Sequence, residues 1–368
     1  MKNILLIIRW FVGLLFIFSG LIKANDPLGL SYKMQEFFEV WALHGLNDYT
    51  LFMSMLMNVF EVLAGVAVII GWRMKLFSWL LLLLIVFFTF LTGYALFSGK
   101  IATCGCFGDC LPLTPAQSFI KDLVLLVFIL ILFFANKKIQ SSLKPIWAIV
   151  LLLGVTSATT MGQFYALKHL PFIDCLPYKK GNNLLAQMEI PKGAVPDLFS
   201  IVFTYQKNGK EISFNQENFP VDFDSSYLFI SRKDKLIKKG NGLQAKIVDF
   251  SLKNFDGTDT TSDIFGQPNP YILLLALDMN QTEIWMSGFE KVWKAATAKN
   301  IPIYLVTADV DKAKSLFKQL SIFSCDATVL KTAARAKPTY FLMQKADVID
   351  KQSYADIDKV LQQIQLLK

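Results

Sequence analysis

Residues 4–23 read ILLIIRWFVGLLFIFSGLIK, an apolar stretch in which Arg9 is the only charge before Lys23. A helix needs about 20 apolar residues to cross the roughly 30 Å hydrocarbon core of a bilayer, and this stretch has that length. It is long for a secretion signal, carries a charge within the apolar run and lacks an A-x-A cleavage pattern before Asn25. We therefore expect a retained membrane-spanning helix.

Four further apolar segments meet or approach the same length, at residues 51–72, 76–98, 117–136 and 145–167. The chain of 368 residues is 54% hydrophobic, and its mean hydropathy is +0.43. Nearly all of this apolar excess precedes residue 168, which predicts a membrane half followed by a soluble half. The net charge is +8, but no long basic run is interleaved with aromatic residues, so the composition does not indicate nucleic-acid binding.

Short basic segments predict the orientation of the helices. Lys2, the turn WRMK at 72–75 and the loop NKKIQSSLK at 136–144 fall on one side of five spans, and basic loops favour the cytoplasm. The loop at 99–116 and everything after residue 168 then lie on the other side. This predicts a multi-pass bacterial inner-membrane protein with a cytoplasmic N-terminus and a periplasmic C-terminal part.

Polar groups within and beside the spans suggest further roles. Arg9 and Glu61 are costly in lipid, and two interpretations stay open for them. Arg9 reaches the cytoplasmic face while Asn58 or a water satisfies Glu61, or the two residues pair or form a quinone or proton site. Residues 31–43, SYKMQEFFEVWAL, mix charges with aromatic residues and predict a short interfacial helix.

Four of the five cysteines lie close to the membrane surface that is predicted to face the periplasm. Cys104, Cys106 and Cys110 occupy the stretch ATCGCFGDCLPLT at 102–114, and Cys175 lies in DCLP, immediately after the fifth span. The predicted compartment permits disulfides. Zinc is disfavoured because the C-x-C spacing is cramped compared with structural zinc sites.

Two interpretations of this cluster remain open. Structural bridges are one, and four cysteines allow three connectivities. The other is thiol–disulfide exchange, in which Cys104 and Cys106 are the exchanging pair across one glycine, whose bridge would be strained. Cys110 and Cys175 would then be a resolving or structural pair.

The part after residue 168 predicts two kinds of structure. Residues 181–245 contain short β-rich segments separated by Asn-Gly and Lys-Asp turns, which predict hairpins. From residue 246 strands alternate with helices, which favours a sheet with helices on its faces. We expect a hairpin around Asp256-Gly257, strands at 270–277, 301–308 and 339–344, and helices at 283–299, 311–320 and 353–367.

The first half resembles the DoxX/MauE group of four-helix membrane proteins. The resemblance rests on RWFVGLLFIFSGLIKANDPLG, on EVLAG, and on CGCFGD followed by SFIKD. MauE, the methylamine-utilisation accessory protein, is linked to disulfide-dependent maturation of a periplasmic enzyme. The resemblance covers residues 1–138 and implies a four-helix bundle there. After it we expect a fifth helix over 139–168, a β-rich extracytoplasmic segment over 169–245 and a further domain over 246–368. The whole fusion resembles an uncharacterised membrane family of Bacteroidota.

The last domain resembles thioredoxin-like domains of the TlpA or peroxiredoxin kind. The stretch AKPTYFLM lies where that fold places its cis-proline loop, so Pro338 is the candidate. The place of the redox motif reads LDMNQTEIW, at 277–285, and contains no cysteine. Cys325 is the single thiol of this domain, either a buried structural cysteine or a lone reactive thiol near the resembled active face.

These features predict a membrane α-helical bundle followed by an α/β thioredoxin-like domain that lacks CxxC. The hypothesis that we favour is an accessory protein for periplasmic thiol–disulfide exchange or partner maturation, with possible oxidoreductase activity. The alternatives are a disulfide-stapled scaffold that binds a periplasmic or membrane partner, and a quinone-binding subunit of an oxidase complex.

Overall fold

The structure is a computed structural model and describes residues 2–101, 103–195, 198–238 and 240–367. The chain forms two compact units, Met1–Asn182 with Ser251–Lys368, and Asn183–Phe250. The sequence predicts a β-rich segment from residue 169, whereas the second unit starts at Asn183. Residues 169–182 belong to the first unit because Cys175 is bridged to Cys110, and the Gly181 amide donates to the Val348 carbonyl.

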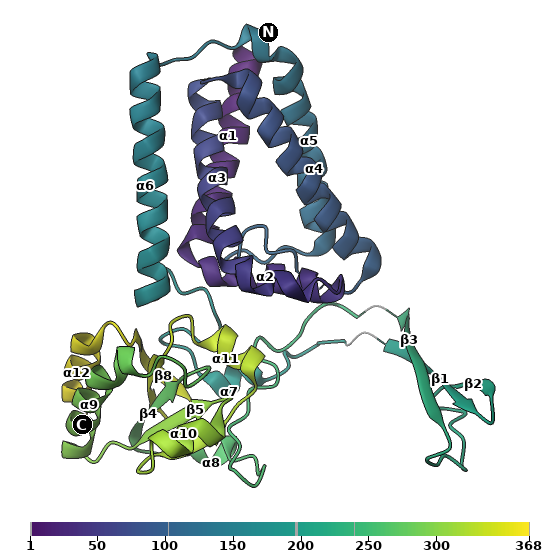
Figure 1. Cartoon of the computed structure of the whole chain (residues 1–368), viewed down its shortest axis with the longest axis vertical. Coiled ribbons are helices and arrows are strands. Elements are labelled where there is room, and N and C mark those ends of the chain that lie inside the picture. The colour runs from purple at the N-terminus through teal and green to yellow at the C-terminus, as the bar shows by residue number, and fades with distance from the viewer. Residues whose placement is uncertain (1, 102, 196–197, 239, 368) are drawn as a thin grey trace. The chain divides into compact units, whose positions relative to one another are not determined.

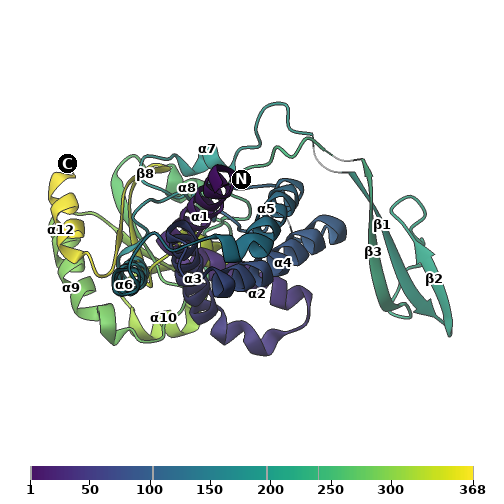
Figure 2. The ribbon, with the colours of Figure 1, turned by 90° about the horizontal axis from the view of Figure 1, so that it is seen from above.

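Five helices of the first unit are long and apolar enough to cross a membrane. They are α1 (Lys2–Asn25), α3 (Thr50–Ile70), α4 (Met74–Ser98), α5 (Pro115–Ala135) and α6 (Pro145–His169). Their outer faces carry exposed apolar side chains such as Phe97 and Phe134, each 80% exposed, which a bilayer would cover. Figure 2 shows α6 end-on, outside the group formed by α1, α3, α4 and α5. The five predicted spans are therefore confirmed as helices.

Helices α1 and α3 pack closely because two glycines face each other. A Cβ atom added to Gly13 would lie 2.7 Å from the carbonyl oxygen of Gly65, and one added to Gly65 would lie 2.6 Å from that of Gly13. Small residues let membrane helices approach closely, since their backbones can then touch. The buried side chains Val12 and Ala64 continue this contact.

A short amphipathic helix, α2 (Pro27–Val40), covers one end of the bundle (Figure 1). It begins with proline at its first position, and the side chain of the N-cap residue Asp26 accepts from the Gly29 amide at 3.1 Å. The helix predicted over 31–43 is thus present but starts earlier. A 3-10 turn, η1 (His44–Tyr49), links it to α3.

The loops that connect the helices of the bundle fall into two groups, one at each end of the bundle. The turn after α3 meets the α5–α6 connection, which contains η2 (Asn136–Lys138), because the Ser142 amide donates to the Ile70 carbonyl at 2.8 Å. The α4–α5 loop with the cysteines lies at the end covered by α2, where Gly105 packs beside Lys33. The basic turns and the cysteines therefore occupy opposite ends of the helices.

The C-terminal region of the first unit contains a five-stranded sheet of order β6-β5-β4-β7-β8. Strands β4, β5 and β6 are parallel, whereas β7 is antiparallel to both β4 and β8. The strands are β4 (Pro270–Leu275), β5 (Ile303–Thr307), β6 (Ser321–Ser324), β7 (Thr339–Gln344) and β8 (Asp347–Ser353). The helices are α8 (Thr261–Phe265), α9 (Glu283–Ala298), α10 (Val310–Leu316), α11 (Ala327–Ala333) and α12 (Ile357–Leu366). Helices α9 and α12 bury Val292 and Ile364 against Ile272 and Leu274 of β4.

The hairpin predicted around Asp256-Gly257 is a turn with a single bridge, between Lys253 and Asp259. It does not extend because Lys253 exchanges two backbone hydrogen bonds with Ser324 at the end of β6. The predicted strands and helices of this region are present, with helix 353–367 starting at Ile357 because β8 takes the residues before it.

The second unit is a three-stranded antiparallel sheet of order β2-β1-β3 preceded by a short helix. The elements are α7 (Leu184–Met188), β1 (Leu198–Lys207), β2 (Lys210–Phe214) and β3 (Leu228–Lys238). An aromatic cluster in which Tyr205 contacts Phe214, Phe223 and Tyr227 packs on this sheet. The hairpin predicted at an Asn-Gly turn is present between β1 and β2, at Asn208-Gly209. The predicted Lys-Asp turn is wrong, because Lys233 and Asp234 lie inside β3 and pair with β1.

Candidate functional site

The loop between α4 and α5 holds three of the cysteines in a compact turn. Gly105 and Gly108 both adopt positive φ angles, +68° and +57°, and the Gly108 amide donates to the Gly105 carbonyl at 3.1 Å. Residues with side chains rarely adopt these angles, so the glycines allow the turn. The loop ends at Thr114, which begins α5 with a capping box to Gln117.

This loop is fixed against α1 and α5. The Ser19 hydroxyl of α1 donates to the Cys106 carbonyl at 3.0 Å. The Phe107 ring contacts Phe18 edge-on, with centroids 5.6 Å apart, and the Lys121 ammonium lies 5.5 Å from the centroid of Phe107. These contacts place the two cysteines that flank Gly105 at the interior side of the bundle end.

Cys104 and Cys106 are free thiols in the structure. Burial, together with the neighbouring Cys106, raises the pKa of Cys104 to about 12. Burial also raises the pKa of Cys106, although the Lys121 ammonium works against this. Both thiols are therefore protonated at neutral pH, and a protonated thiol is a weak nucleophile.

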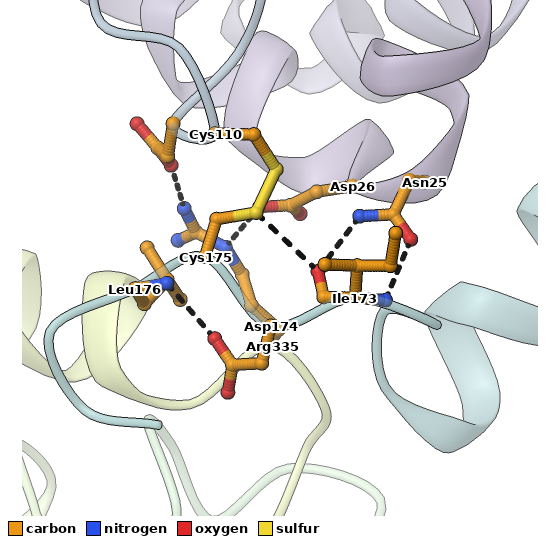
Figure 3. Close-up of a disulfide and its surroundings, with 9 residues drawn as sticks. Asn25, Asp26, Cys110, Ile173, Asp174, Cys175, Leu176 and Arg335 are labelled. Atoms are coloured by element: carbon orange, nitrogen blue, oxygen red, sulfur yellow. Dashed lines mark hydrogen bonds and ion pairs between the residues drawn. A yellow bond between two sulfur atoms is a disulfide. The ribbon is translucent and has the colours of Figure 1, made fainter. Parts of the chain in front are cut away.

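The structure pairs Cys110 with Cys175 in a disulfide, with Cα atoms 4.9 Å apart (Figure 3). This bridge joins the α4–α5 loop to the segment that follows α6. Asn25, at the end of α1, strengthens the same junction, because its side chain exchanges two hydrogen bonds with the backbone of Ile173, at 2.9 and 3.0 Å. Since Cys110 and Cys175 are bridged, they are not available as thiolate ligands for a metal.

Arg335 connects the C-terminal region to this junction (Figure 3). Its guanidinium donates to Asp26 and to Asp109, at 2.8 Å in each case, and to the Lys331 carbonyl at 2.7 Å. The side chain is only 4% exposed. Burial alone would lower the pKa of Arg335, but Asp26 and Asp109 outweigh it and raise this pKa, so the charge is held firmly.

A further ion pair and a hydrogen bond join the same parts. The Lys351 ammonium of β8 donates to Asp174 at 2.7 Å, beside Cys175. The His169 ring, at the end of α6, lies 3.0 Å from the Asp356 carboxylate. The sequence offered no signal for these pairs, because their members are distant in the chain.

Inside the bundle, two buried lysine–carboxylate pairs lie near the cysteine loop. Lys23 of α1 binds Glu61 of α3, and both side chains are almost fully buried. Lys121 binds its neighbour Asp122, whose other oxygen accepts from Thr92 at 3.0 Å. A buried charge is tolerated when it is paired in this way.

Of the two interpretations that the sequence left open for Arg9 and Glu61, their pairing is not found in the structure. Arg9 donates instead to the carbonyls of Val68 and Ile69 at the end of α3, where carbonyls lack helical partners. Fourteen residues of α1, about 21 Å, separate Arg9 from Lys23, so Glu61 is level with Lys23 and not with Arg9. The interpretation that Arg9 is satisfied near the end of the bundle is thus closer to the structure, and the partner of Glu61 was missed.

A cavity of about 370 Å³ is lined by Lys23, Lys121 and Asp122 of these pairs and by the cysteine loop. Its walls come from α1, α2, α3, α4 and α5, and from Cys104, Gly105 and Cys106 of the loop. Its lining is overwhelmingly apolar, with the charged groups gathered beside the thiols. The two free thiols therefore face a space large enough for a small-molecule ligand.

The face of the C-terminal sheet predicted to carry Pro338 is also hollowed. The Lys337–Pro338 peptide bond is cis, as expected. A second cavity, of about 440 Å³, is lined by Pro338, Asp278 and Trp285, and by Leu28 and Leu167 from the bundle. The segment 277–285, which lacks cysteine, thus lies at the junction with the bundle.

Cys325 is not part of either site. It is buried at the end of β6, and burial raises its pKa to about 11. A buried and protonated thiol has the properties of a structural cysteine.

The membrane half matches a known family. Residues 1–135 match the family model described as methylamine utilisation protein MauE. This part of the chain is a MauE-like membrane domain. Residues 199–239, in the second unit, match a domain of unknown function, DUF8463.

One curated relative matches part of the chain. Protein TlpB of Flavobacterium psychrophilum is 26% identical over 160 residues, which are 43% of this chain and 42% of that protein. The match thus spans less than half of either protein. No solved structure matches the chain. The protein is a multi-pass membrane protein with a MauE-like bundle followed by a sheet-containing region.

Proposed function

We propose that this protein is a membrane thiol–disulfide oxidoreductase that acts on cysteines of partner proteins outside the cytosol. The observation that carries the proposal is the division of the cysteine cluster. Cys110 and Cys175 form a bridge, while Cys104 and Cys106 are left as free thiols on either side of one glycine.

In the exchange, a thiolate of the partner attacks the Cys104–Cys106 disulfide and forms a mixed disulfide. A second partner thiolate resolves it, so the partner gains one disulfide and the pair is reduced to two thiols. Burial of the reduced pair, with its raised pKa values, protects it from freely diffusing reagents. A partner that docks at the loop would reach it directly.

The proposed orientation places the cysteine loop and the C-terminal region in the periplasm of an inner-membrane protein, with the N-terminus in the cytoplasm. Arg73 and Lys144 lie at the opposite end of the bundle, in turns that approach each other. Basic turns favour the cytoplasmic side, which supports this orientation.

The C-terminal region is proposed to be thioredoxin-like. Its strand order with a central parallel β4–β5 pair, its antiparallel β7–β8 pair and its cis Lys337–Pro338 bond support this proposal. Since residues 277–285 lack cysteine, the region would position partners and not exchange disulfides itself.

The exchange is tested with the variants Cys106→Ser and Cys104→Ser in native membranes. Each leaves one thiol of the pair, which can still attack a disulfide of the oxidised partner in the reverse of the exchange. The mixed disulfide that forms accumulates, because the second cysteine of the pair, which would resolve it, is absent. Mass spectrometry should locate that bond at the remaining cysteine of the pair. Cys325→Ser is the matched control and should trap nothing. Absence of any mixed disulfide at Cys104 or Cys106 would refute the proposal.

A second candidate function is a disulfide-stapled scaffold that binds a partner without chemistry. The observation that favours it is the fixed junction formed by Cys110–Cys175 and by the ion pairs of Arg335. The double variant Cys104→Ser/Cys106→Ser separates the two functions. A scaffold keeps its effect on the partner in this variant, whereas an oxidoreductase loses it.

A further inference from the structure

The 370 Å³ cavity of the bundle has two chemically different ends. The end beside the cysteine loop carries the ammonium groups of Lys23, Lys33 and Lys121. The rest of the lining, called the apolar end, is formed by aromatic and aliphatic side chains, among them Met57 and Phe60. Such a space suits an amphiphilic molecule whose polar head accepts hydrogen bonds and whose remainder is apolar.

The apolar end opens toward the side of the bundle. Its rim includes Met53 and Leu56 of α3 and Phe87 of α4, which are 38%, 58% and 45% exposed. Figure 1 shows α3 and α4 diverging toward α2, which crosses below them. Because the outer surface of the spans faces lipid, a ligand would enter this rim from the bilayer and not from water.

The polar end of the cavity contains two thiols that can be oxidised to a disulfide. Cys104 and Cys106 line it together with Lys121 and Asp122. A ligand head placed there would contact the two thiols and would receive hydrogen bonds from ammonium donors. The occupant that satisfies every feature is a ring with carbonyl oxygens, able to take electrons and carried on a lipid-soluble tail.

We propose that this cavity binds a lipid-soluble quinone, which is the electron acceptor of the Cys104–Cys106 pair. The inference rests on the proposed thiol–disulfide exchange, which leaves the pair reduced after each turnover. Two thiols lose two protons and two electrons as the S–S bond forms, and the same two electrons and two protons convert the quinone to its hydroquinone. Lys33 and Lys121 are the donors to the ring oxygens, and Trp41 lies along the cavity wall.

Binding is tested with ubiquinone-1 and, separately, menaquinone-1, added to the full-length protein in detergent. Their rings are fully substituted, so thiols cannot add to them. Quinones quench tryptophan fluorescence, and we expect saturable quenching that falls in the Trp41→Phe variant. The double variant Cys104→Ser/Cys106→Ser should still show saturable quenching but should not reduce the quinone, because it has no thiols to supply electrons.

Three variants define the site. Lys121→Gln should weaken binding about tenfold, in the range expected for losing one hydrogen bond to a charged donor. Leu91→Trp, which fills the cavity, should abolish saturable binding. Lys138→Gln, exposed in η2 at the opposite end of the bundle, is the matched control and should bind like the wild type. A cooperative thermal unfolding transition shows whether each variant is folded. Trp41→Phe keeps an aromatic ring in the cavity wall and serves as an independent aromatic variant of the site.

Electron transfer is measured separately. With the pair reduced and oxygen excluded, either quinone should oxidise Cys104 and Cys106 to a disulfide, detected by alkylation and mass spectrometry, with one hydroquinone formed per disulfide. Organic extraction of the purified protein should also recover quinone. Recovery of phospholipid alone, unsaturable quenching, or binding unaffected by Leu91→Trp would overturn the inference. If quinone binds and oxidises the pair but Cys106→Ser traps no partner, the proposed exchange with proteins fails while the quinone site stands.

Discussion

The Arg335 guanidinium donates to the Asp109 carboxylate at 2.8 Å, one residue before Cys110 in the chain. The same guanidinium binds Asp26, the N-cap of α2. One side chain therefore joins the C-terminal sheet, the helix that covers the bundle and the cysteine loop. Because Arg335 is buried, its two carboxylate partners fix it more firmly than an exposed pair would.

The first prediction concerns this contact. Arg335→Ala should lower the free energy of unfolding by about 2–3 kcal/mol, since hydrogen bonds between charged groups are lost in a buried setting. Dithiothreitol should also reduce Cys110–Cys175 faster, because the loop that carries Cys110 is less restrained. Arg232→Ala removes a half-exposed ion pair with Asp234 and should change neither unfolding nor reduction. If Arg335→Ala and Arg232→Ala had equal effects on unfolding and on disulfide reduction, Arg335 would not restrain the cysteine loop.

The disulfide gives the second prediction. Cys110 and Cys175 are 65 residues apart, and a bridge over such a loop stabilises a protein by about 2–4 kcal/mol. Cys110→Ser and Cys175→Ser should each lower the unfolding free energy by this amount. The double variant should be no less stable than either single one, because both remove the same bond. Additive losses would mean that the two cysteines act separately.

The fold follows from sequence patterns where these are long. The five spans are predictable from apolar length alone, and β4 from its buried run at 270–275. Four elements of the C-terminal region, α8, β6, α11 and β8, were not predicted. Strand β6 has four residues, and β8 reads DVIDKQS, a polar sequence that is stable as a strand only because β7 lies beside it.

The candidate site also has features that the sequence predicts and features that only the folded structure reveals. The cysteine cluster and the approach of Cys175 to the loop could be inferred because local spacing and helix order bring them to one end of the bundle. Neither Lys23–Glu61 nor Arg335–Asp109 has a local signal, since their partners are 38 and 226 residues apart. The cavity beside the thiols could not be foreseen either, because its shape depends on how far α3 and α4 diverge.

The reactivity of Cys104 provides the third prediction. Only the thiolate reacts with iodoacetamide, and a pKa raised from 9.0 to about 12 lowers the thiolate fraction at pH 8 about a thousandfold. In the folded protein, alkylation of Cys104 should therefore be slow and should rise about tenfold per pH unit between pH 8 and 10. Peptide mass spectrometry measures it, and the detergent-denatured chain is the control. Native and denatured rates that agree at pH 8 would contradict the burial of this thiol.

The fourth prediction tests the buried pair Lys23–Glu61. Both side chains are almost inaccessible, so Lys23→Met leaves a carboxylate without a partner in an apolar surrounding. Removing one member of such a pair costs about 3–5 kcal/mol, whereas replacing both can be nearly neutral. We expect a large loss of thermal stability in Lys23→Met and most of it restored in Lys23→Met/Glu61→Gln.

The matched control for this pair is Lys33→Met, which breaks a partly exposed ion pair with Glu36 and should change stability little. A stability restored in the double variant would show that the charge of Glu61, and not the shape of Lys23, sets the cost. If the double variant were as unstable as Lys23→Met, the lysine would act through packing against Phe88, whose ring centroid lies 5.2 Å from its ammonium. Because Lys23 also lines the 370 Å³ cavity, quinone binding measured on the same two variants would show whether this ammonium is tied to Glu61 alone or is also shared with the ligand.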